Sequence, residues 1–229
     1  MNCETIIEKL KELSNPESVK HMARFGINPN NNLGISIYKL RELAKQIEKN
    51  HELALNLWES EIHDARLLAC FVDRPNWVTE NQMDLWAHDF DSWDVCDQAC
   101  TSLFDRSAFA WKKVFEWAES DKKFVKRGAF SLIAGLAVHD KNASNEEFEE
   151  FTTIIRKHSL DDRNYVKKAV NWALRNIGKR NLNLNKKMIQ LAEEISTLDS
   201  KSARWIAFDA LRELKSEKIQ NRIKNKKRI

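Results

Sequence analysis

The sequence predicts an all-α protein built from short helices. Three observations predict this class: the 229 residues include only 5 glycines and 3 prolines, apolar residues recur at helical spacing along most of the chain, and related segments return at regular intervals. Runs of β-branched residues long enough for the strands of a sheet are scarce. We therefore expect nearly every periodic segment to be a helix.

The helices follow in order along the chain. The first three are expected at residues 5–13, 16–24 and 36–49, and the turn-rich segment NPNNNLG precedes the third. Further helices are expected to begin near Ala54, His63, Asn81, Ser92, Ala108, Lys122, Asn145, Asp162, Asn185 and Ser200. His63 is interpreted as a helix-start residue without a catalytic role. The result is about thirteen short helices with brief polar connectors, as in arrays of helix pairs.

Three segments repeat one outline, in which a charged residue precedes small and apolar positions. They are VKRGAFSLIAGL from Val125, VKKAVNWALRNI from Val166 and ARWIAFDALREL from Ala203, at offsets of 41 (166 − 125) and 37 (203 − 166) residues. Helix pairs at such periods are typical of tetratricopeptide, HEAT and armadillo repeats, and the degenerate pattern favours HEAT-like units. The predicted architecture is a right-handed α-solenoid, with one HEAT-like domain over residues 1–217. Residues 218–229 are expected to form a basic tail, more typical of a frayed end than of a dedicated DNA contact.

Composition limits the partners and the compartment. The formal net charge is only +4, so a surface that binds nucleic acid has to come from clustered cations. The N-terminus contains acidic residues and no long apolar run, which predicts a cytoplasmic protein without a signal peptide or membrane span. The four cysteines fit no disulfide framework. Cys96 and Cys100 share a helix face, but no second pair or nearby histidine completes a metal site, so we expect core residues and no metal.

Residues 161–181 form the most informative segment, because as a helix they have two chemically different faces. One face is apolar: Val166, Val170, Ala173, Leu174 and Ile177. The opposite face is cationic and aromatic: Tyr165, Lys168, Trp172, Arg175 and Lys179. A tryptophan among lysines and arginines suits an anion that carries flat rings, and nucleic acid is such an anion.

Equivalent faces of stacked repeats are expected to line one concave basic groove. In the repeat from Val125 that face would hold Lys123, Arg127 and Phe130. In the preceding repeat, Trp93 and Asp97 are spaced i, i+4. A carboxylate among cations repels a phosphate, but it has a use if positive charge develops nearby during a reaction.

At these residues the chain resembles a known family. SWDVCD with Trp93 and Asp97, KRGAF with Arg127, and NWALR with Trp172 and Arg175 resemble the site of the AlkD-type DNA glycosylases, HEAT-like repeat enzymes that excise alkylated purines. The resemblance covers nearly the whole chain. An aromatic residue of the first helices also contributes in that family, and here VKHMARFG offers His21 and Phe25 but no tyrosine.

The resemblance implies a monofunctional DNA glycosylase that acts on N3- or N7-alkylated purines in double-stranded DNA and leaves an abasic site. Trp93, Asp97 and Trp172 would act at the lesion, and Arg127 and Arg175 would hold phosphates. Lys168, Lys179 and Arg163 would add sequence-independent positive charge. An alkylated purine is already cationic and leaves without prior protonation, so a carboxylate that stabilises the oxocarbenium-like sugar and positions water is sufficient. Water is the only co-substrate, no cofactor is expected, and a monomer suffices.

Other interpretations remain open. The second functional class is a non-catalytic HEAT-repeat protein that binds distorted or branched DNA, and a scaffold for protein partners ranks last. Trp93 and Trp172 could be packing residues, as the six other tryptophans are expected to be. Asp97 could pair with Arg127 or Arg175 in an ion ladder between repeats, and the lysines and arginines near residue 170 could be a solvated face.

Overall fold

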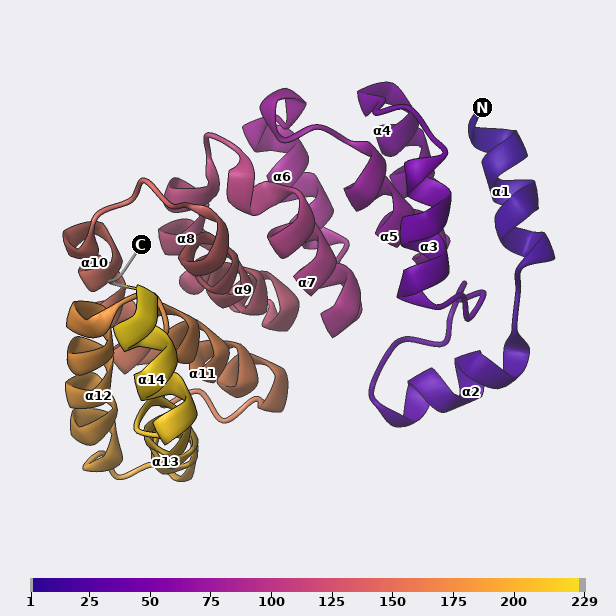
Figure 1. Ribbon diagram of the computed structural model, residues 1–229. Coiled ribbons are helices and arrows are strands. Elements are labelled where there is room, and N and C mark those ends of the chain that lie inside the picture. The colour runs from indigo at the N-terminus through magenta and orange to yellow at the C-terminus, as the bar shows by residue number, and fades with distance from the viewer. Residues whose placement is uncertain (1, 227–229) are drawn as a thin grey trace. The chain divides into compact units, whose positions relative to one another are not determined.

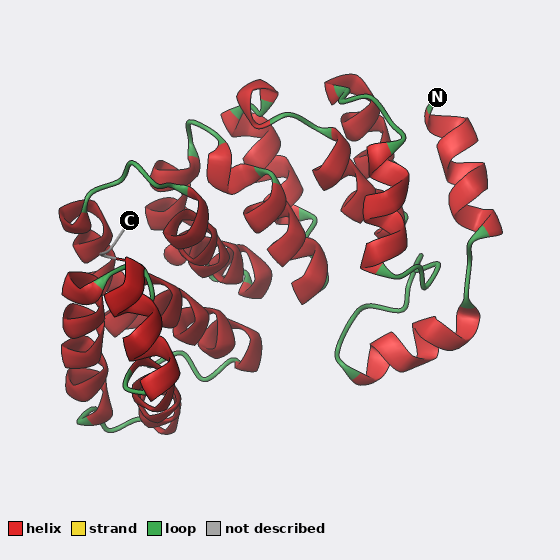
Figure 2. Ribbon diagram, viewed as in Figure 1, coloured by secondary structure: helices red, strands yellow, loops and turns green. Residues whose placement is uncertain are grey.

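The computed structural model describes residues 2–226, and it confirms the all-α class. This part of the chain folds into fourteen α-helices and two short 3-10 helices, with no strand among the described residues (Figure 2). None of the helices described has both the length and the apolar character needed to cross a membrane.

The chain divides into two compact units, Met1–Phe109 and Ala110–Ile229 (Figure 1). The first unit contains α1 (Cys3–Glu12), α2 (Pro16–Arg24), α3 (Ile37–Lys45), α4 (His51–Glu59), α5 (His63–Val72), η1 (Pro75–Trp77), α6 (Glu80–His88), α7 (Trp93–Ser102) and η2 (Phe104–Arg106). The second contains α8 (Ala110–Ala118), α9 (Lys123–His139), α10 (Asn145–His158), α11 (Asn164–Gly178), α12 (Leu182–Ser196), α13 (Lys201–Leu214) and α14 (Glu217–Lys226). The single domain expected over residues 1–217 stays a prediction, because one repeat array can contain two compact units.

Short polar side chains fix where most helices begin. In the first unit Asn2, Asn15, Ser36 and Asn50 each accept a hydrogen bond from a backbone N–H of the first helical turn. Such caps satisfy N–H groups that the helix itself leaves without acceptors. The caps explain why connectors rich in Asn and Ser end sharply in helices.

The core of the first unit surrounds α5, which packs against α3, α4 and α7. Nearly every residue of α5 is buried, including the polar His63 and Asp64. Trp58 of α4 and Trp86 of α6 stack face to face, with ring centroids 4.0 Å apart. This dense packing gives α5 and α7 a fixed mutual position within the unit.

In the second unit α9, α11 and α13 are the central helices, and α11 packs against both of the others. Gly178 is the last residue of α11 and lies close to side chains of α12 and α13. A Cβ atom at this glycine would lie 2.8 Å from the methyl groups of Leu214 and 3.2 Å from Cβ of Met188. The glycine therefore permits close contact among α11, α12 and α13.

The C-terminal part of the prediction was wrong. Residues expected to fray form α14, which is helical as far as Lys226, and Ile219 and Ile223 on it are buried. The side chain of Gln220 donates hydrogen bonds to Asn185 of α12 and to the backbone oxygen of Leu214. Two buried isoleucines at i, i+4 give this basic segment an apolar stripe. Residues 227–229 of the expected tail lie outside the described part of the chain.

Candidate functional site

Trp93 and Asp97 lie one turn apart on α7, so they share a face of that helix. The indole N–H of Trp93 donates a hydrogen bond to the backbone oxygen of Phe25, at a distance of 3.1 Å. Asp97 is only 8% exposed. The first unit thus presents a partly exposed indole with a fixed orientation and a nearly buried carboxylate on the same helix.

A second carboxylate of α7, that of Asp94, is paired with His63 at a distance of 2.9 Å, and the hydroxyl of Ser92 donates to its other oxygen. Burial disfavours the charged imidazole, but the hydrogen bond to Asp94 and the charges of Asp94, Asp64 and Asp91 outweigh it and raise the pKa of His63. Burial likewise opposes ionisation of Asp94, but the partners His63 and Ser92 lower the pKa of this carboxyl. An ion pair therefore anchors the first turn of α7.

The loop between α2 and α3 is fastened to α5. The carboxylate of Asp64 accepts hydrogen bonds from the backbone N–H groups of Leu33, at 2.6 Å, and Ile35, at 2.8 Å. The amide of Asn28 in the same loop donates to Asp91, just before α7, at 2.6 Å. Because the loop begins next to the carbonyl that holds the α7 indole, these bonds also support the orientation of that indole.

Two aromatic residues of the first helices, His21 and Phe25, contact each other near the carbonyl that binds this indole. His21 and Phe25 form a ring contact with centroids 5.1 Å apart, and the carbonyl of Phe25 is the acceptor for Trp93. The structure therefore connects Phe25 to Trp93 through its backbone carbonyl and His21 to Phe25 through its ring.

α11 has the two faces that the sequence predicted. The apolar residues are fully buried: Val166, Val170, Ala173, Leu174 and Ile177. The opposite side, which we call the cationic-aromatic face, is partly or fully exposed to solvent. It consists of Tyr165, Lys168, Trp172, Arg175 and Lys179. Within residues 2–226 the indole N–H of Trp172 has no hydrogen-bond partner, and Lys168 forms no ion pair. These two side chains are thus available to a ligand.

Two cations of this face are bound to α13. Arg175 contacts the carboxylate of Glu213 at 2.6 Å and that of Asp209 at 3.7 Å, and Lys179 contacts Glu213 at 3.0 Å. Burial opposes ionisation of Glu213, but the hydrogen bond and charge of Lys179, with those of Arg175, lower the pKa of this carboxyl. Glu213 therefore remains anionic near neutral pH and competes with any phosphate for both cations.

Arg163 and Arg127 are also tied to groups of the second unit. The guanidinium of Arg163 donates hydrogen bonds to the carboxylate of Asp161, with an Nε–Oδ1 distance of 2.9 Å, and to the backbone oxygen of Asp121 at 2.7 Å. Arg127 is 6% exposed and donates to the backbone oxygen of Tyr165 at 2.6 Å. Their role in holding phosphates stays a prediction.

The expected groove face of α9 was partly wrong. Phe130, which the pattern placed beside Lys123 and Arg127, is fully buried. The physical reason is that α9 packs against both α8 and α11, so almost all of its residues are enclosed. Lys123 is exposed at the start of α9, with its Nζ 4.3 Å from the ring centroid of Phe124.

The six other tryptophans were expected to be packing residues, and this holds for four of them. Trp58, Trp86 and Trp117 are buried, and Trp111 stacks on Phe151 with centroids 4.9 Å apart. The expectation was wrong for Trp77 and Trp205, which keep large exposed areas.

The structure thus groups the expected site residues within each unit: Trp93 with Asp97 on α7, and Lys168, Trp172, Arg175 and Lys179 on α11. The concave groove expected to unite them stays a prediction. Sequence reasoning missed Glu213 and Asp209. Arg175 and Glu213 are 38 residues apart, which differs by only one residue from the offset of 37 between the two repeats. The repeat spacing was therefore the signal that could have paired them.

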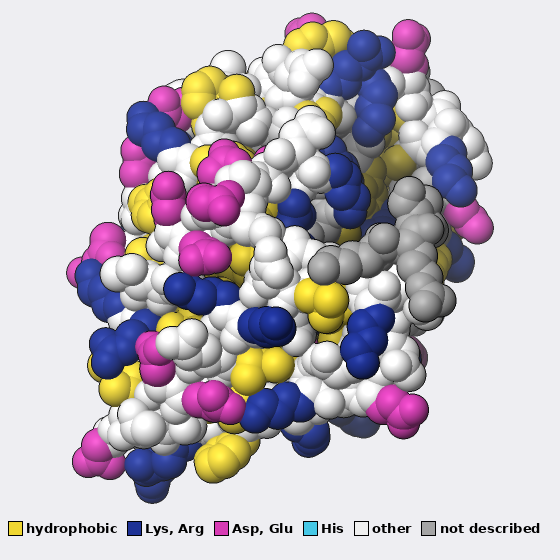
Figure 3. Space-filling view, turned by 60° about the vertical axis from the view of Figure 1, so that its left-hand side comes forward, with side chains coloured by type: hydrophobic (Ala, Val, Ile, Leu, Met, Phe, Trp, Pro, Cys, Tyr) yellow, Lys and Arg dark blue, Asp and Glu magenta, His cyan; other side chains and the backbone are white. Residues whose placement is uncertain are grey.

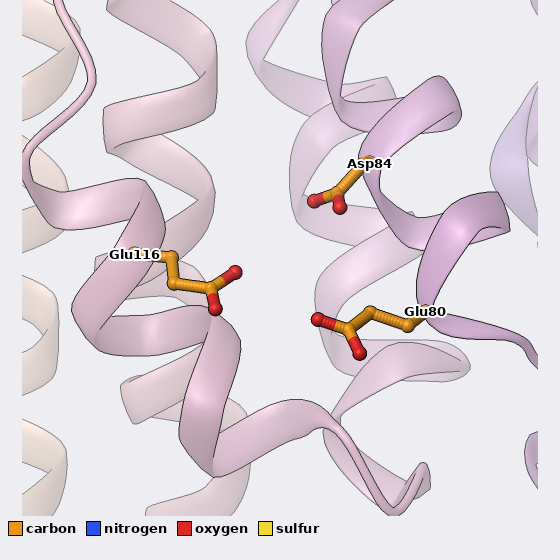
Figure 4. Close-up of side chains that lie close together, drawn as sticks. All are labelled: Glu80, Asp84 and Glu116. Carbon is orange, nitrogen blue, oxygen red and sulfur yellow. The ribbon is translucent and has the colours of Figure 1, made fainter.

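Among the described residues, the acidic and thiol groups form no metal site within either unit. Glu80 and Asp84 lie one turn apart on α6, and Glu116 lies on α8 of the other unit (Figure 4). Glu116 is paired with Lys113 at 2.6 Å. Cys96 and Cys100 are fully buried, as expected of core residues.

Positive charge is spread over the molecule as well as clustered. On the face shown in Figure 3, Lys and Arg side chains lie among Asp, Glu and hydrophobic side chains, which agrees with a net charge of only +4. The cationic-aromatic face of α11 is therefore a local feature and not part of a uniformly basic surface.

These features define a class of protein: a helical-repeat protein with a nearly buried acid, partly exposed tryptophans and a cationic helix face. The comparison with protein families gives the same result. Residues 6–221 match the model of the DNA alkylation repair enzyme family, and the chain belongs to this family. The resemblance inferred from the motifs is thereby confirmed.

A solved structure shares the fold. It is described as a new family of proteins related to the HEAT-like repeat DNA glycosylases with affinity for branched DNA structures. The TM-score is 0.82 at 18% sequence identity, over 97% of this chain and 96% of the other. At this identity the likeness establishes the fold, a HEAT-like helical repeat.

Two bacterial proteins are similar in sequence. An uncharacterized protein of Listeria innocua is 24% identical over 82% of this chain and 83% of its own length. An uncharacterized protein of Listeria monocytogenes is 27% identical over 55% of this chain and 58% of its own length.

Proposed function

We propose that this protein is a monofunctional DNA glycosylase that removes cationic N3- and N7-alkylated purines from double-stranded DNA. The observation that carries the proposal is Asp97, a carboxylate only 8% exposed and one turn after Trp93 on α7. A protein that only binds DNA gains nothing from an acid that repels phosphate. An acid is useful where a cationic sugar forms.

The reaction needs no acid catalyst. The bond between C1′ and the base nitrogen breaks with its electron pair on the departing purine, which becomes neutral. Water then attacks C1′ and gives up a proton, and the carboxylate of Asp97 stabilises the sugar cation and accepts that proton. An abasic site and the free base are the products.

The remaining site residues would bind the damaged strand. Trp93 and Trp172 are proposed to contact the lesion-bearing nucleotide through their ring faces, each contact contributing about 0.5–2 kcal/mol. Phosphates would be held by Arg127, Arg175, Lys168, Arg163 and Lys179. Lys168 is exposed and has no ion-pair partner within residues 2–226, so it is the cation most directly available.

A second candidate function is the binding of branched DNA without chemistry. The observation that favours it is the fold shared, at a TM-score of 0.82, with a protein described as related to the glycosylases and having affinity for branched DNA.

The release of free 7-methylguanine and 3-methyladenine from methylated duplex DNA separates the two functions. We expect release by the native protein and a loss of about 100- to 1,000-fold in the single-turnover rate of Asp97→Asn, because the charge that stabilises the sugar is removed. Asp199→Asn, at a fully exposed aspartate of the second unit, is the matched control and should retain the native rate.

Each outcome has a distinct meaning. Binding of four-way junctions without release of either base would reject the glycosylase and leave the second candidate. Equal rates for the native protein and Asp97→Asn would keep the enzyme but remove Asp97 from its mechanism.

A further inference from the structure

α13 carries exposed aromatic side chains that no part of the proposed reaction uses. Trp205 is 40% and Phe208 65% exposed, whereas the opposite side of the helix is fully buried. The solvent side of α13, from here on the α13 stripe, consists of Lys201, Arg204, Trp205, Phe208 and Arg212. Exposed large apolar groups that adjoin one another commonly mark binding surfaces.

The α13 stripe is positively charged. Nζ of Lys167 on α11 lies 5.0 Å from the ring centroid of Trp205, and Lys201 forms no ion pair within residues 2–226. Arg204 contacts Asp199 at 3.4 Å, but both side chains are exposed to solvent, so this pair contributes little and can exchange partners. Arg212 likewise contacts Asp209, and the side chain of this arginine is exposed. The two rings are therefore flanked by cations: Lys201, which has no ion pair within residues 2–226, and two arginines in exposed ion pairs.

The stripe also adjoins the cationic-aromatic face of α11. α11 and α13 pack against each other, and Lys167 over Trp205 and Arg175 beside Asp209 connect the two surfaces. A strand that follows the cations of α11 would thus meet the rings of α13 without leaving the second unit.

This combination favours nucleic acid, because cations lie on both sides of the two rings, as a ligand with phosphates on both sides of its bases requires. It favours unpaired nucleotides over a continuous duplex, because bases in a duplex have their faces covered by neighbouring bases. A base without a partner exposes a face that an aromatic ring can stack on, and each such stack contributes about 1–3 kcal/mol.

We propose that the α13 stripe is a binding site for unpaired nucleotides, in which Trp205 and Phe208 stack on bases and the flanking Lys and Arg residues hold phosphates. The proposal deepens the proposed function, since it rests on DNA as the ligand, but it concerns a different helix and a different DNA structure. From Lys201 to Arg212 the stripe is about 16 Å long at 1.5 Å per residue, which matches about five nucleotides at 3.4 Å each.

The test compares a duplex that contains a five-nucleotide single-stranded gap with a continuous duplex of the same length, both fluorescently labelled and free of lesions. We expect Phe208→Ala and Trp205→Ala each to weaken binding of the gapped DNA about 5- to 150-fold, which is the equivalent of one lost stack. Binding of the continuous duplex should change less than twofold. Phe208→Tyr keeps a ring and should retain the native affinity for the gap.

Leu85→Ala is the matched control, because Leu85 on α6 is also apolar and 58% exposed. It should leave both affinities unchanged. Equal weakening of gapped and continuous DNA by Phe208→Ala, or no weakening of either, would overturn the proposal. Poly-glutamate and oligo-dT are also compared as competitors of the gapped DNA. Equal competition would overturn the proposal, because it would show that the rings do not stack on bases and that an acidic peptide binds the stripe equally well.

Release of methylated bases, measured on the same preparations, keeps the two proposals separate. Native base release with unchanged gap binding in Phe208→Ala rejects the α13 stripe and retains the glycosylase. No base release with selective loss of gap binding rejects the glycosylase and retains the stripe.

Discussion

The start of α7 and the cationic-aromatic face of α11 hold their polar groups in opposite ways. At the start of α7, Asp94 is paired with His63, and the buried Asp64 of the adjacent α5 accepts hydrogen bonds from backbone N–H groups of the α2–α3 loop. At α11, partly exposed cations are bound by the carboxylates of α13. The side chains of the first arrangement are more deeply buried than those of the second.

The difference teaches which task each region can perform. These bonds hold the start of α7 and the Trp93 indole in one geometry, as a reaction at a single bond requires. Solvent-exposed ion pairs contribute little to stability and exchange a carboxylate for a phosphate at small cost. We therefore expect the first region to position side chains, and we predict reversible DNA contact at the second.

The largest effect on this comparison is expected from Asp64→Asn. The amide keeps the shape of the side chain but turns an N–H₂ group toward a backbone N–H of Leu33 or Ile35. We expect the free energy of unfolding to fall by about 3 kcal/mol, measured by urea denaturation. Asp162→Asn, at an exposed residue of the second unit, should change it by less than about 0.5 kcal/mol. Equal losses of unfolding free energy in Asp64→Asn and Asp162→Asn would show that the buried hydrogen bonds of the first region do not stabilise the fold more than an exposed residue does.

His63→Gln is expected to have a smaller effect that depends on pH. The raised pKa of His63 and the lowered pKa of Asp94 mean that the pair stabilises the fold fully between about pH 4 and pH 6.5. This contribution is lost as pH rises through the pKa of His63 and as pH falls through that of Asp94. We expect the variant to lose about 1–3 kcal/mol at pH 6 and less at pH 9. A loss that is the same at both pH values would contradict a charged pair.

Glu213→Gln tests whether α13 restrains the cations of α11. The substitution removes the carboxylate charge that Arg175 and Lys179 share, so we expect the affinity for duplex DNA to rise about 3- to 10-fold. The slope of log affinity against log salt should steepen by about 1 for each additional phosphate that the two cations neutralise. Glu193→Gln changes the net charge equally at an exposed pair with Lys215 and should have less than a twofold effect. An unchanged slope in Glu213→Gln would mean that the cations do not meet phosphates.

The smallest expected effect is a difference in unfolding free energy between Trp93→Phe and Trp172→Phe. Trp93→Phe removes an indole N–H that donates to Phe25, whereas Trp172→Phe removes one that has no partner within residues 2–226. Because the ring is reduced equally, the difference between the two losses in unfolding free energy isolates the hydrogen bond. We expect Trp93→Phe to cost about 1 kcal/mol more than Trp172→Phe. Equal costs would show that the bond does not fix the Trp93 ring.

The sequence predicted the helices and the buried face of α11 because the spacing of apolar residues depends on one helix at a time. It did not predict how many neighbours surround a helix, so Phe130 of α9 was placed at the surface although it is fully buried. It also missed Glu213, since its pairing with Arg175 depends on the register between two helices. It also predicted a frayed tail in place of α14, because the basic composition of this segment outweighed its two isoleucines, which are buried.

Gly178 connects the interior of the second unit to its surface chemistry. A methyl group there would collide with Leu214, the residue that follows Glu213 on α13. A shift of α13 to relieve that collision would carry the Glu213 carboxylate away from Arg175 and Lys179. In a genetic screen, Gly178→Ala would then appear as a change in DNA affinity, although it introduces no charge and lies in the interior. Variants of this chain are best interpreted by which helix they displace, and not only by whether they touch the ligand.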